Sequence, residues 1–458
     1  MRSVVPTSEG PQSPRMAEQR TVVGLSSRIS FLALVLAVCG SASMVHYYLG
    51  VFIPRMLEAQ AERGLEGYSW GNDFHPVWFT AREAIVAHRD PYSPEMTRQL
   101  QIGVFGRPLN PLSPHDPPVQ YRQYAYPAFT EVVMWPAALL PFPQLRILLA
   151  VLLPLLSVTT LGFWVRALRW QLETLWFLFL VLLTLTSYQM LEALFAEQLG
   201  LFVALLLAAA ALSIREKRLL LAGVLTSLTL MKPETSALAI LYLLLWSFSD
   251  RRRARFWQGF AVVSLALTAS TLWAWPHWVS EWIHIVLGYT RYAMPPLIQI
   301  LLGKSVPAYI GKAISGCFIA SAAFVAWRNR TASADSRAFW FTLSLVLAIT
   351  CVAILPGQAI YDHTILIPGI FLTVLNRRTL MAAGWIPRML LYAGELLLLW
   401  PWITAPVVRV MHHWVSTSPS YSPALFALPI RSATPLPFAV LTLLWWTWRV
   451  TRTQPEPA

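Results

Sequence analysis

The chain has little charge for its length. Of its 458 residues, 12% are Asp, Glu, Lys or Arg, and 56% are hydrophobic. A soluble globular protein carries about 25% charged residues. So few ionisable groups cannot cover a surface in water, and the composition excludes a water-soluble enzyme. The mean hydropathy of +0.53 agrees, and an aromatic content of 13% excludes long disorder.

Cysteine is also scarce. Cys39, Cys317 and Cys351 all lie in apolar runs, and no two of them have the Cys-x-x-Cys spacing. The sequence therefore supports neither a disulfide framework nor a zinc site. We expect all three to be small buried residues.

The net charge of +13 could indicate a nucleic acid partner, but the basic residues are scattered between apolar runs. The positive-inside rule places arginine-rich breaks in the cytoplasm. Together with the two tails, Arg28 and Glu173, these segments hold 21 basic and seven acidic residues, and the rest of the chain holds 14 basic and 15 acidic residues. The excess is an orientation signal, and we predict no nucleic acid partner. The breaks are Arg166/Arg169, 215–218, 250–255, 328–337, Arg377/Arg378 with Arg388, and Arg449/Arg452.

The apolar runs predict an all-α polytopic membrane protein with about twelve crossings. Both termini then lie in the cytoplasm, as tails over 1–27 and 450–458, around a single transmembrane domain over 28–449. The first helix is long enough to span and is expected to remain uncleaved. The crossings begin near Ser30, Leu145, Thr174, Leu199, Leu219, Thr235, Phe256, Pro307, Ala338, Ile360, Gly384 and Pro435.

Three segments lie outside the predicted crossings. Residues 54–127 form the longest polar stretch and the first extracytoplasmic loop, with seven basic and eight acidic residues. Residues 128–140 do not fit as a crossing, because counting them would put every later arginine cluster outside. We expect them, and residues 284–302, to be re-entrant or interfacial on the outer face.

Two of the crossings are short. Residues 219–231 and 235–249 meet at Met231-Lys232-Pro233, where proline breaks a helix. Thirteen helical residues span only about 20 Å of a core that is about 30 Å thick. Irregular backbone at that depth is tolerated where it lines a cavity or is covered by protein. Lys232 is therefore predicted to lie below the outer surface, at the floor of a site.

An acid followed by aromatics stands in the first loop, at Gly71-Asn72-Asp73-Phe74. A carboxylate at a membrane interface could accept a proton from a hydroxyl. Equally, Asp73 could cap a helix through residues 78–87, and spacing alone favours that structural role.

Several motifs, in order, resemble glycosyltransferase family 87, whose members include polyprenyl-phosphate-mannose-dependent mannosyltransferases of the GT-C class. The resemblance covers roughly residues 65–375. It departs from the family at Ala128, where the family prefers proline, and at Glu197, where it has glycine. The motifs are Asp73-Phe74, 78–82, Asp90-Pro91-Tyr92, Tyr126-Pro127-Ala128, Leu140-Pro141, Glu197-Gln198-Leu199, Lys232-Pro233 and Tyr361-Asp362-His363.

The resemblance implies a GT-C-like bundle and an inverting transfer of a hexosyl group, with Asp73 as general base. The donor would be a polyprenyl phosphate sugar and the acceptor a hydroxyl of a glycolipid or glycan, at the extracytoplasmic face of a bacterial inner membrane. Lys232 is the first candidate to meet the leaving phosphate and His363 the second. Alternatively, Lys232 could snorkel to the outer headgroups, and His363 could be a hydrogen-bonded structural histidine.

Five further residues are candidates for binding substrate. Arg82 could orient Asp73, contact phosphate or form a loop salt bridge. Glu197 and Gln198 could bind sugar hydroxyls or lie in a solvated loop. Tyr124 and Tyr126 could flank a sugar ring, although packing in the aromatic belt is the commoner role.

Neither a metal nor another cofactor is expected. A nucleotide-sugar enzyme would need a cytoplasmic domain and often an Asp-x-Asp pair, and the sequence has neither. A transporter or lipid flippase is the alternative function, since broken helices and buried charge also mark transporters. No inverted repeat supports it.

Overall fold

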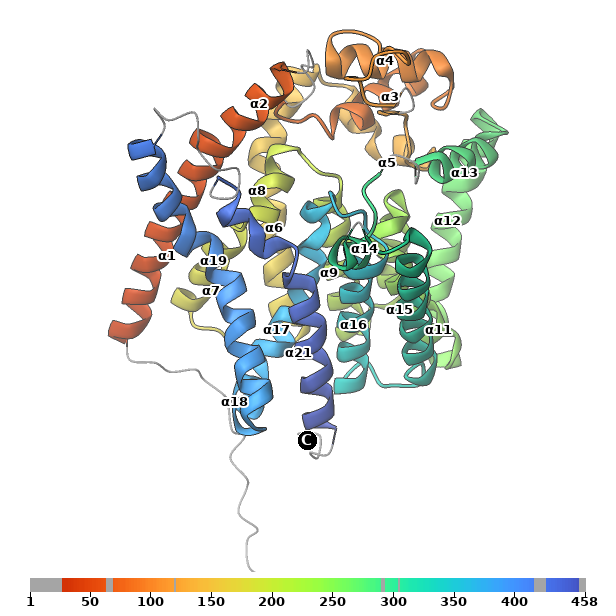
Figure 1. The fold of residues 1–458 in the computed structure, drawn as a ribbon. Helices are drawn as coiled ribbons and strands as arrows, with labels where there is room; N and C mark the ends of the chain where they lie inside the picture. Colours follow the sequence, from red (N-terminus) through yellow and green to blue (C-terminus); the bar gives the residue numbers. More distant parts are fainter. Residues whose placement is uncertain are drawn as a thin grey trace, which may run out of the picture.

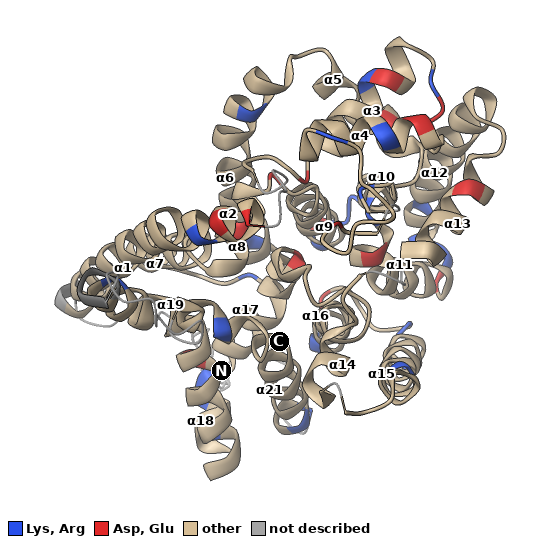
Figure 2. Ribbon diagram, turned by 45° about the horizontal axis from the view of Figure 1, so that its top comes forward, with Lys and Arg blue, Asp and Glu red and all other residues tan. Residues whose placement is uncertain are grey.

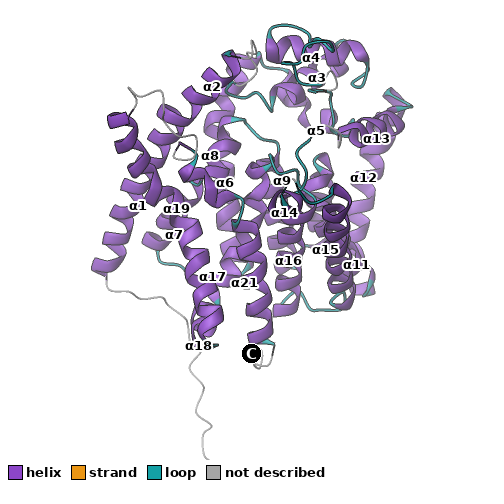
Figure 3. Ribbon diagram, viewed as in Figure 1, coloured by secondary structure: helices purple, strands orange, loops and turns teal. Residues whose placement is uncertain are grey.

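A computed structural model describes residues 27–62, 69–118, 121–289, 293–303, 305–415 and 426–452. Every regular element in these ranges is helical, and one isolated bridge pairs Pro296 with Pro356 (Figure 3). The all-α prediction is confirmed. The predicted tails lie outside the described residues over 1–26 and 453–458.

Six helical segments are long and apolar enough to cross a membrane. Their outward faces carry exposed leucine, isoleucine and valine, as at Ile147 and Val151. Such faces suit lipid, and the chain is a polytopic membrane protein. The segments are α1 (Ser27–Tyr47) with the π-helical turn Tyr48–Phe52 and α2 (Ile53–Ala61); α6 (Phe142–Ala167); α12 (Ala254–Ala274); α15 (Ala308–Arg328); α19 (Trp385–Val415); and η5 (Leu428–Ala433) with α21 (Leu436–Thr451).

A seventh segment is the pair α7 (Thr174–Leu185) and α8 (Tyr188–Phe195), bent by 62°. Five shorter apolar segments complete the bundle. Eleven of the twelve begin within about three residues of the predicted crossings, and the last begins at Leu428, seven residues before Pro435. The number that spans stays a prediction because the five are short. These five are α9 (Gly200–Arg215), α10 (Leu219–Leu228) with η2 (Thr229–Met231), α11 (Pro233–Phe248), α16 (Arg337–Ala353), and η4 (Ile360–Leu366) with α17 (Ile367–Leu375).

The arginine-rich breaks gather at one end of the bundle. Arg166 pairs with Glu216 at 3.1 Å, and Arg169 and Arg215 both pair with Asp335, at 3.2 and 2.9 Å. Arg253 of the turn η3 (Arg251–Arg253) donates to backbone carbonyls of the neighbouring 330–332 turn. This end, with α18 (Arg377–Ala382), is the lower end in Figure 1. Segments predicted to share one side of the membrane therefore lie together.

The first loop covers the opposite end (Figure 1). Its helices are α3 (His75–Val86) and α4 (Pro94–Phe105), and α5 (Phe129–Ala138) packs along α3. The Trp78 indole donates to the Leu140 carbonyl at 2.9 Å, which keeps both ends of α5 beside the loop. Figure 2, with this end brought forward, shows acidic residues on the loop helices.

The second predicted non-crossing segment lies at the same end. It comprises α13 (Trp278–Tyr289) and α14 (Leu297–Leu302). The Trp282 indole donates to the Ala125 carbonyl at 2.9 Å, and the Gly357 amide donates to Pro295 at 3.0 Å. Helices α13 and α14 therefore lie toward the loop end of the bundle.

The structure corrects the prediction for cysteine. Cys351 is buried, but Cys39 and Cys317 are exposed on the outer surface of α1 and α15. Both helices have one face turned away from the bundle, with exposed apolar residues such as Leu36 and Phe324.

Candidate active site

Asp73 is held against the end of α8 by backbone hydrogen bonds. The Gly71 amide donates to Phe195 at 2.9 Å, and the Asp73 amide donates to Ala196 at 3.2 Å. Gly71 has a φ of +76°, and a Cβ there would lie 2.7 Å from an oxygen of Glu197. Glycine permits this conformation and this close approach.

The Asp73 carboxylate does not cap α3. No side chain caps the first turn of this helix. Instead, Arg122 donates to Oδ1 at 2.8 Å and the Gln198 amide donates to Oδ2. The helix-capping alternative is therefore wrong, and both carboxylate oxygens are oriented by residues remote in sequence.

A chain of polar contacts continues from Asp73 into the bundle. Lys232 donates to Gln198 Oε1 at 3.3 Å and to both carboxylate oxygens of Asp362 at 2.7 Å. The five residues Arg122, Asp73, Gln198, Lys232 and Asp362 form what we call the polar chain. It joins the loop, the α8–α9 turn, the α10–α11 break and η4.

Accessibility decreases along the polar chain. The side chains of Asp73 and Arg122 are 19% and 17% exposed, whereas those of Lys232 and Asp362 are 5% and 1% exposed. Two cations balance two carboxylates, which reduces the cost of burying them. Among the described residues, the Asp73 end is therefore the more accessible end of the polar chain.

The break that positions Lys232 is the one that the sequence predicts. Helix α10 ends at Leu228, η2 follows, and α11 begins at Pro233. Lys232 itself adopts extended backbone angles, with φ −138° and ψ 76°. Its side chain turns inward to Asp362, so the snorkelling alternative is wrong.

Glu197 is buried in the turn between α8 and α9. Its φ of +55° lies in the left-handed region, where a side chain costs about 1–2 kcal/mol. This conformation explains why glycine would be preferred here. Burial raises the pKa of Glu197 to about 8, partly offset by Arg146. Gln198 is buried as well, so the solvated-loop alternative is wrong for both.

The two predicted tyrosines differ in their surroundings. Tyr126 lies near the polar chain: burial, then Glu234, Asp73 and Asp362, raise the pKa of its phenol. Tyr124 is buried and its ring packs against Tyr126, at 5.6 Å between centroids, as expected for a packing role.

Arg82 and His363 are not part of the polar chain. Arg82 is exposed and lies over the Trp78 ring at 5.8 Å, so the prediction that it orients Asp73 is wrong. His363 is buried beside Asp362, but its Nδ1 has no hydrogen-bond partner among the described residues.

Sequence reasoning missed Arg122 and Asp362. Asp362 was within a recognised motif, where an acid in an apolar helix start was a usable signal. Arg122 offered no such signal, because it is one of seven bases in the loop. Among the described residues, no three His, Cys, Asp or Glu side chains group as metal ligands.

A comparison with protein families matches residues 124–356, just over half of the chain, to glycosyltransferase family 87. The chain belongs to this family. It is therefore a membrane glycosyltransferase of the hexosyltransferase type. This family membership supports the enzyme over the alternative of a transporter or lipid flippase. No curated protein and no solved structure matches it. The matched residues include Gln198 and Lys232, whereas Asp73 and Asp362 lie outside them.

Proposed function

We propose that this glycosyltransferase moves a mannosyl group from a polyprenyl phosphate sugar to a hydroxyl of a glycolipid or glycan, with inversion. Asp73 is the general base. The observation that carries this proposal is the carboxylate at the accessible end of the polar chain, with both oxygens oriented by Arg122 and Gln198. A fixed carboxylate that an acceptor can reach is what base catalysis needs.

The proposed step moves one proton and exchanges one bond. The acceptor oxygen attacks the anomeric carbon while its proton passes to the Asp73 carboxylate. The bond from the anomeric carbon to the phosphate oxygen breaks, and the polyprenyl phosphate leaves with the electron pair. Negative charge develops on that phosphate and needs a cation nearby.

Arg122 suits the leaving phosphate better than Lys232. An ammonium has three donors, and Lys232 directs them to Asp362 and Gln198. Arg122 has five donors, of which Nη1 contacts Asp73 and Nε has no partner among the described residues. We assign Lys232 to holding Gln198 in place. His363 stays a second candidate for the phosphate, and Tyr126 and Glu197 for the sugar.

The reaction is placed at the extracytoplasmic face of a bacterial inner membrane. The polar chain lies at the end opposite the arginine clusters, which the positive-inside rule assigns to the cytoplasm. With an even number of crossings, both termini are cytoplasmic. This orientation lets the lipid-linked donor stay in the bilayer while its sugar reaches Asp73.

The direct test measures transfer of radiolabelled mannose from polyprenyl phosphate mannose in membranes. Asp73→Asn keeps the side-chain shape but removes the base, and we expect a rate lower by about 10²–10⁴-fold. Asp116→Asn is the matched control, because Asp116 is also a loop carboxylate paired with arginine, 2.7 Å from Arg107. Wild-type transfer by Asp73→Asn would exclude the general-base role.

A further inference from the structure

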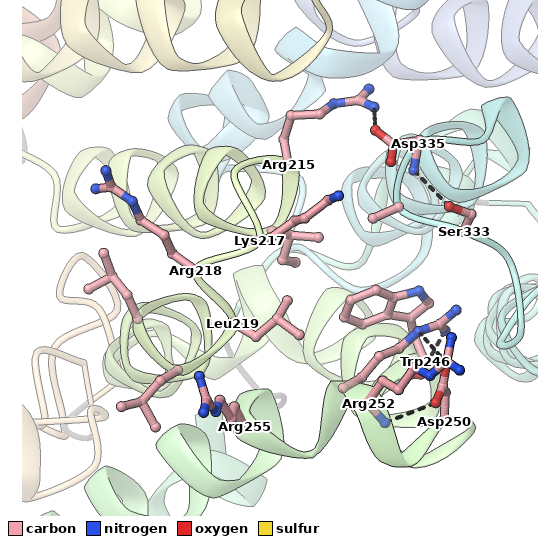
Figure 4. A pocket seen from close by; sticks show the side chains of 15 residues that line it. Arg215, Lys217, Arg218, Leu219, Trp246, Asp250, Arg252, Arg255, Ser333 and Asp335 are labelled. Atoms are coloured by element: carbon pink, nitrogen blue, oxygen red, sulfur yellow. Dashed lines mark hydrogen bonds and ion pairs between the residues drawn. The ribbon is translucent and has the colours of Figure 1, made fainter. Parts of the chain in front are cut away.

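A cavity of about 780 Å³ opens at the end of the bundle opposite Asp73. It lies among the turn between α9 and α10, the end of α11, the start of α12 and the 333–335 turn (Figure 4). None of its lining residues belongs to the polar chain. The cavity is therefore a separate place in the fold from the candidate active site.

The lining of this cavity is strongly basic. Arg215 is paired with Asp335, and Arg253 is occupied by backbone carbonyls and by the Trp246 ring at 4.5 Å. The other cations have less compensation. The charged residues of the lining are Arg215, Lys217, Arg218, Arg252, Arg253 and Arg255, against Asp250 and Asp335.

Three of these cations are free of carboxylates. Lys217, Arg252 and Arg255 are exposed, and no ion pair or hydrogen bond engages their side chains in the described part of the chain. They approach the cavity from two different elements, α9–α10 on one side and α11–α12 on the other (Figure 4). Unpaired cations that line one cavity give it a positive potential, which attracts a polyvalent anion.

One wall of the cavity is apolar. It is formed by Leu219, Leu220 and Leu221 at the start of α10. Leu220 and Leu221 are 53% and 43% exposed, and α10 packs on α12, whose Val262 and Leu265 are exposed further along the bundle. The basic cavity thus opens onto the surface that faces acyl chains.

We propose that this cavity binds the headgroup of an anionic phospholipid from the leaflet at that end. The phosphate would lie among Lys217, Arg252 and Arg255, with an acyl chain along the leucine wall. Basic pockets between transmembrane helices on the cytoplasmic side are suited to such headgroups. The apolar wall favours a lipid over a free phosphate, because a free phosphate has no apolar part that could contact the leucines. This site does not depend on the identity of the sugar or on the role of Asp73.

The test counts lipids retained by the purified full-length protein, using native mass spectrometry after titration with phosphatidylglycerol or phosphatidylcholine. Wild type should retain phosphatidylglycerol preferentially. The triple variant Lys217→Ala, Arg252→Ala, Arg255→Ala should bind it about 100-fold more weakly, since each base near the surface contributes about fivefold.

The matched control removes the same number of exposed charges at the same end of the bundle, outside the cavity: Arg328→Ala, Arg378→Ala, Arg452→Ala. It should bind like wild type, and both triples should unfold at the wild-type temperature. Equal binding by the two triples would overturn the site. Displacement of the lipid by millimolar inorganic phosphate would overturn a lipid occupant in favour of the free anion.

Discussion

The buried pair of Lys232 and Asp362 offers a quantitative test of the site's architecture. At 2.7 Å and an effective dielectric constant of about 20, their Coulomb attraction is about 6 kcal/mol. Desolvation of the two ions offsets most of this. Removing one partner leaves an uncompensated buried charge, which costs about 3–5 kcal/mol.

The perturbation is a double-mutant cycle of Lys232→Met and Asp362→Asn. Each single variant should lose about 3–5 kcal/mol of stability. The double variant removes both charges and leaves two buried amides, at positions 198 and 362, short of a partner, so it should lose about 2–4 kcal/mol. The coupling energy should therefore be at least about 2 kcal/mol. Transfer activity should stay low in the double variant, because Gln198 loses the contact with Lys232 that holds it.

Stability would be followed by denaturant or thermal unfolding of the purified protein in detergent. The exposed pair of Arg377 and Glu395, at 2.7 Å and with 45% and 33% exposure, is the control. The same cycle there should give a coupling of about 1 kcal/mol or less. Additive effects at Lys232 and Asp362, or single variants as stable as wild type, would refute the reasoning.

Three further predictions concern the site and the topology. Burial raises the pKa of Glu197 from 4.5 to about 8, so folding takes up a proton between these pH values, and the free energy of unfolding should fall as pH rises from about 5 to 8. Glu197→Gln should remove this pH dependence when unfolding is measured across a pH series. Parallel curves for wild type and variant would contradict the prediction. Gly200→Ala directs a Cβ onto the buried Asp362 carboxylate and should lower both transfer and stability, whereas Gly316→Ala, with nothing within 4 Å, should leave transfer unchanged. Reporter fusions near Asn110 and Arg252 should locate outside and inside the cytoplasm respectively, and the reverse would remove the proposed orientation.

The helices could be predicted from the sequence because their signals are local. Apolar runs and arginine-rich breaks marked the start of eleven of the twelve segments within about three residues, and Pro233 marked the break at Lys232. The sign of the charges flanking residues 128–140 and 284–302 predicts that these segments do not cross, and α5, α13 and α14 lie toward the loop end of the bundle. The exposed cysteines were missed because an apolar run does not show which face turns to lipid.

The site could be predicted only in part. Asp73, Gln198 and Lys232 were found because motifs in order pointed to them. The same motifs misdirected Arg82, since adjacency in sequence does not give the direction of a side chain on a helix. Arg122 was indistinguishable from the other loop bases until its contact with Asp73 was seen.

The sequence by itself determined the environment of this protein: a membrane, a basic end and a broken helix with one lysine. These depend on composition and on spacing within a few turns. The tertiary structure decided which charges meet, because the contacts of the polar chain join residues 49, 125 and 130 positions apart. An unpaired charge in the interior costs several kcal/mol, so these contacts decide the role of each residue. Lys232 is buried and all its donors are engaged, whereas Asp73 is accessible and Arg122 has donors without a partner among the described residues.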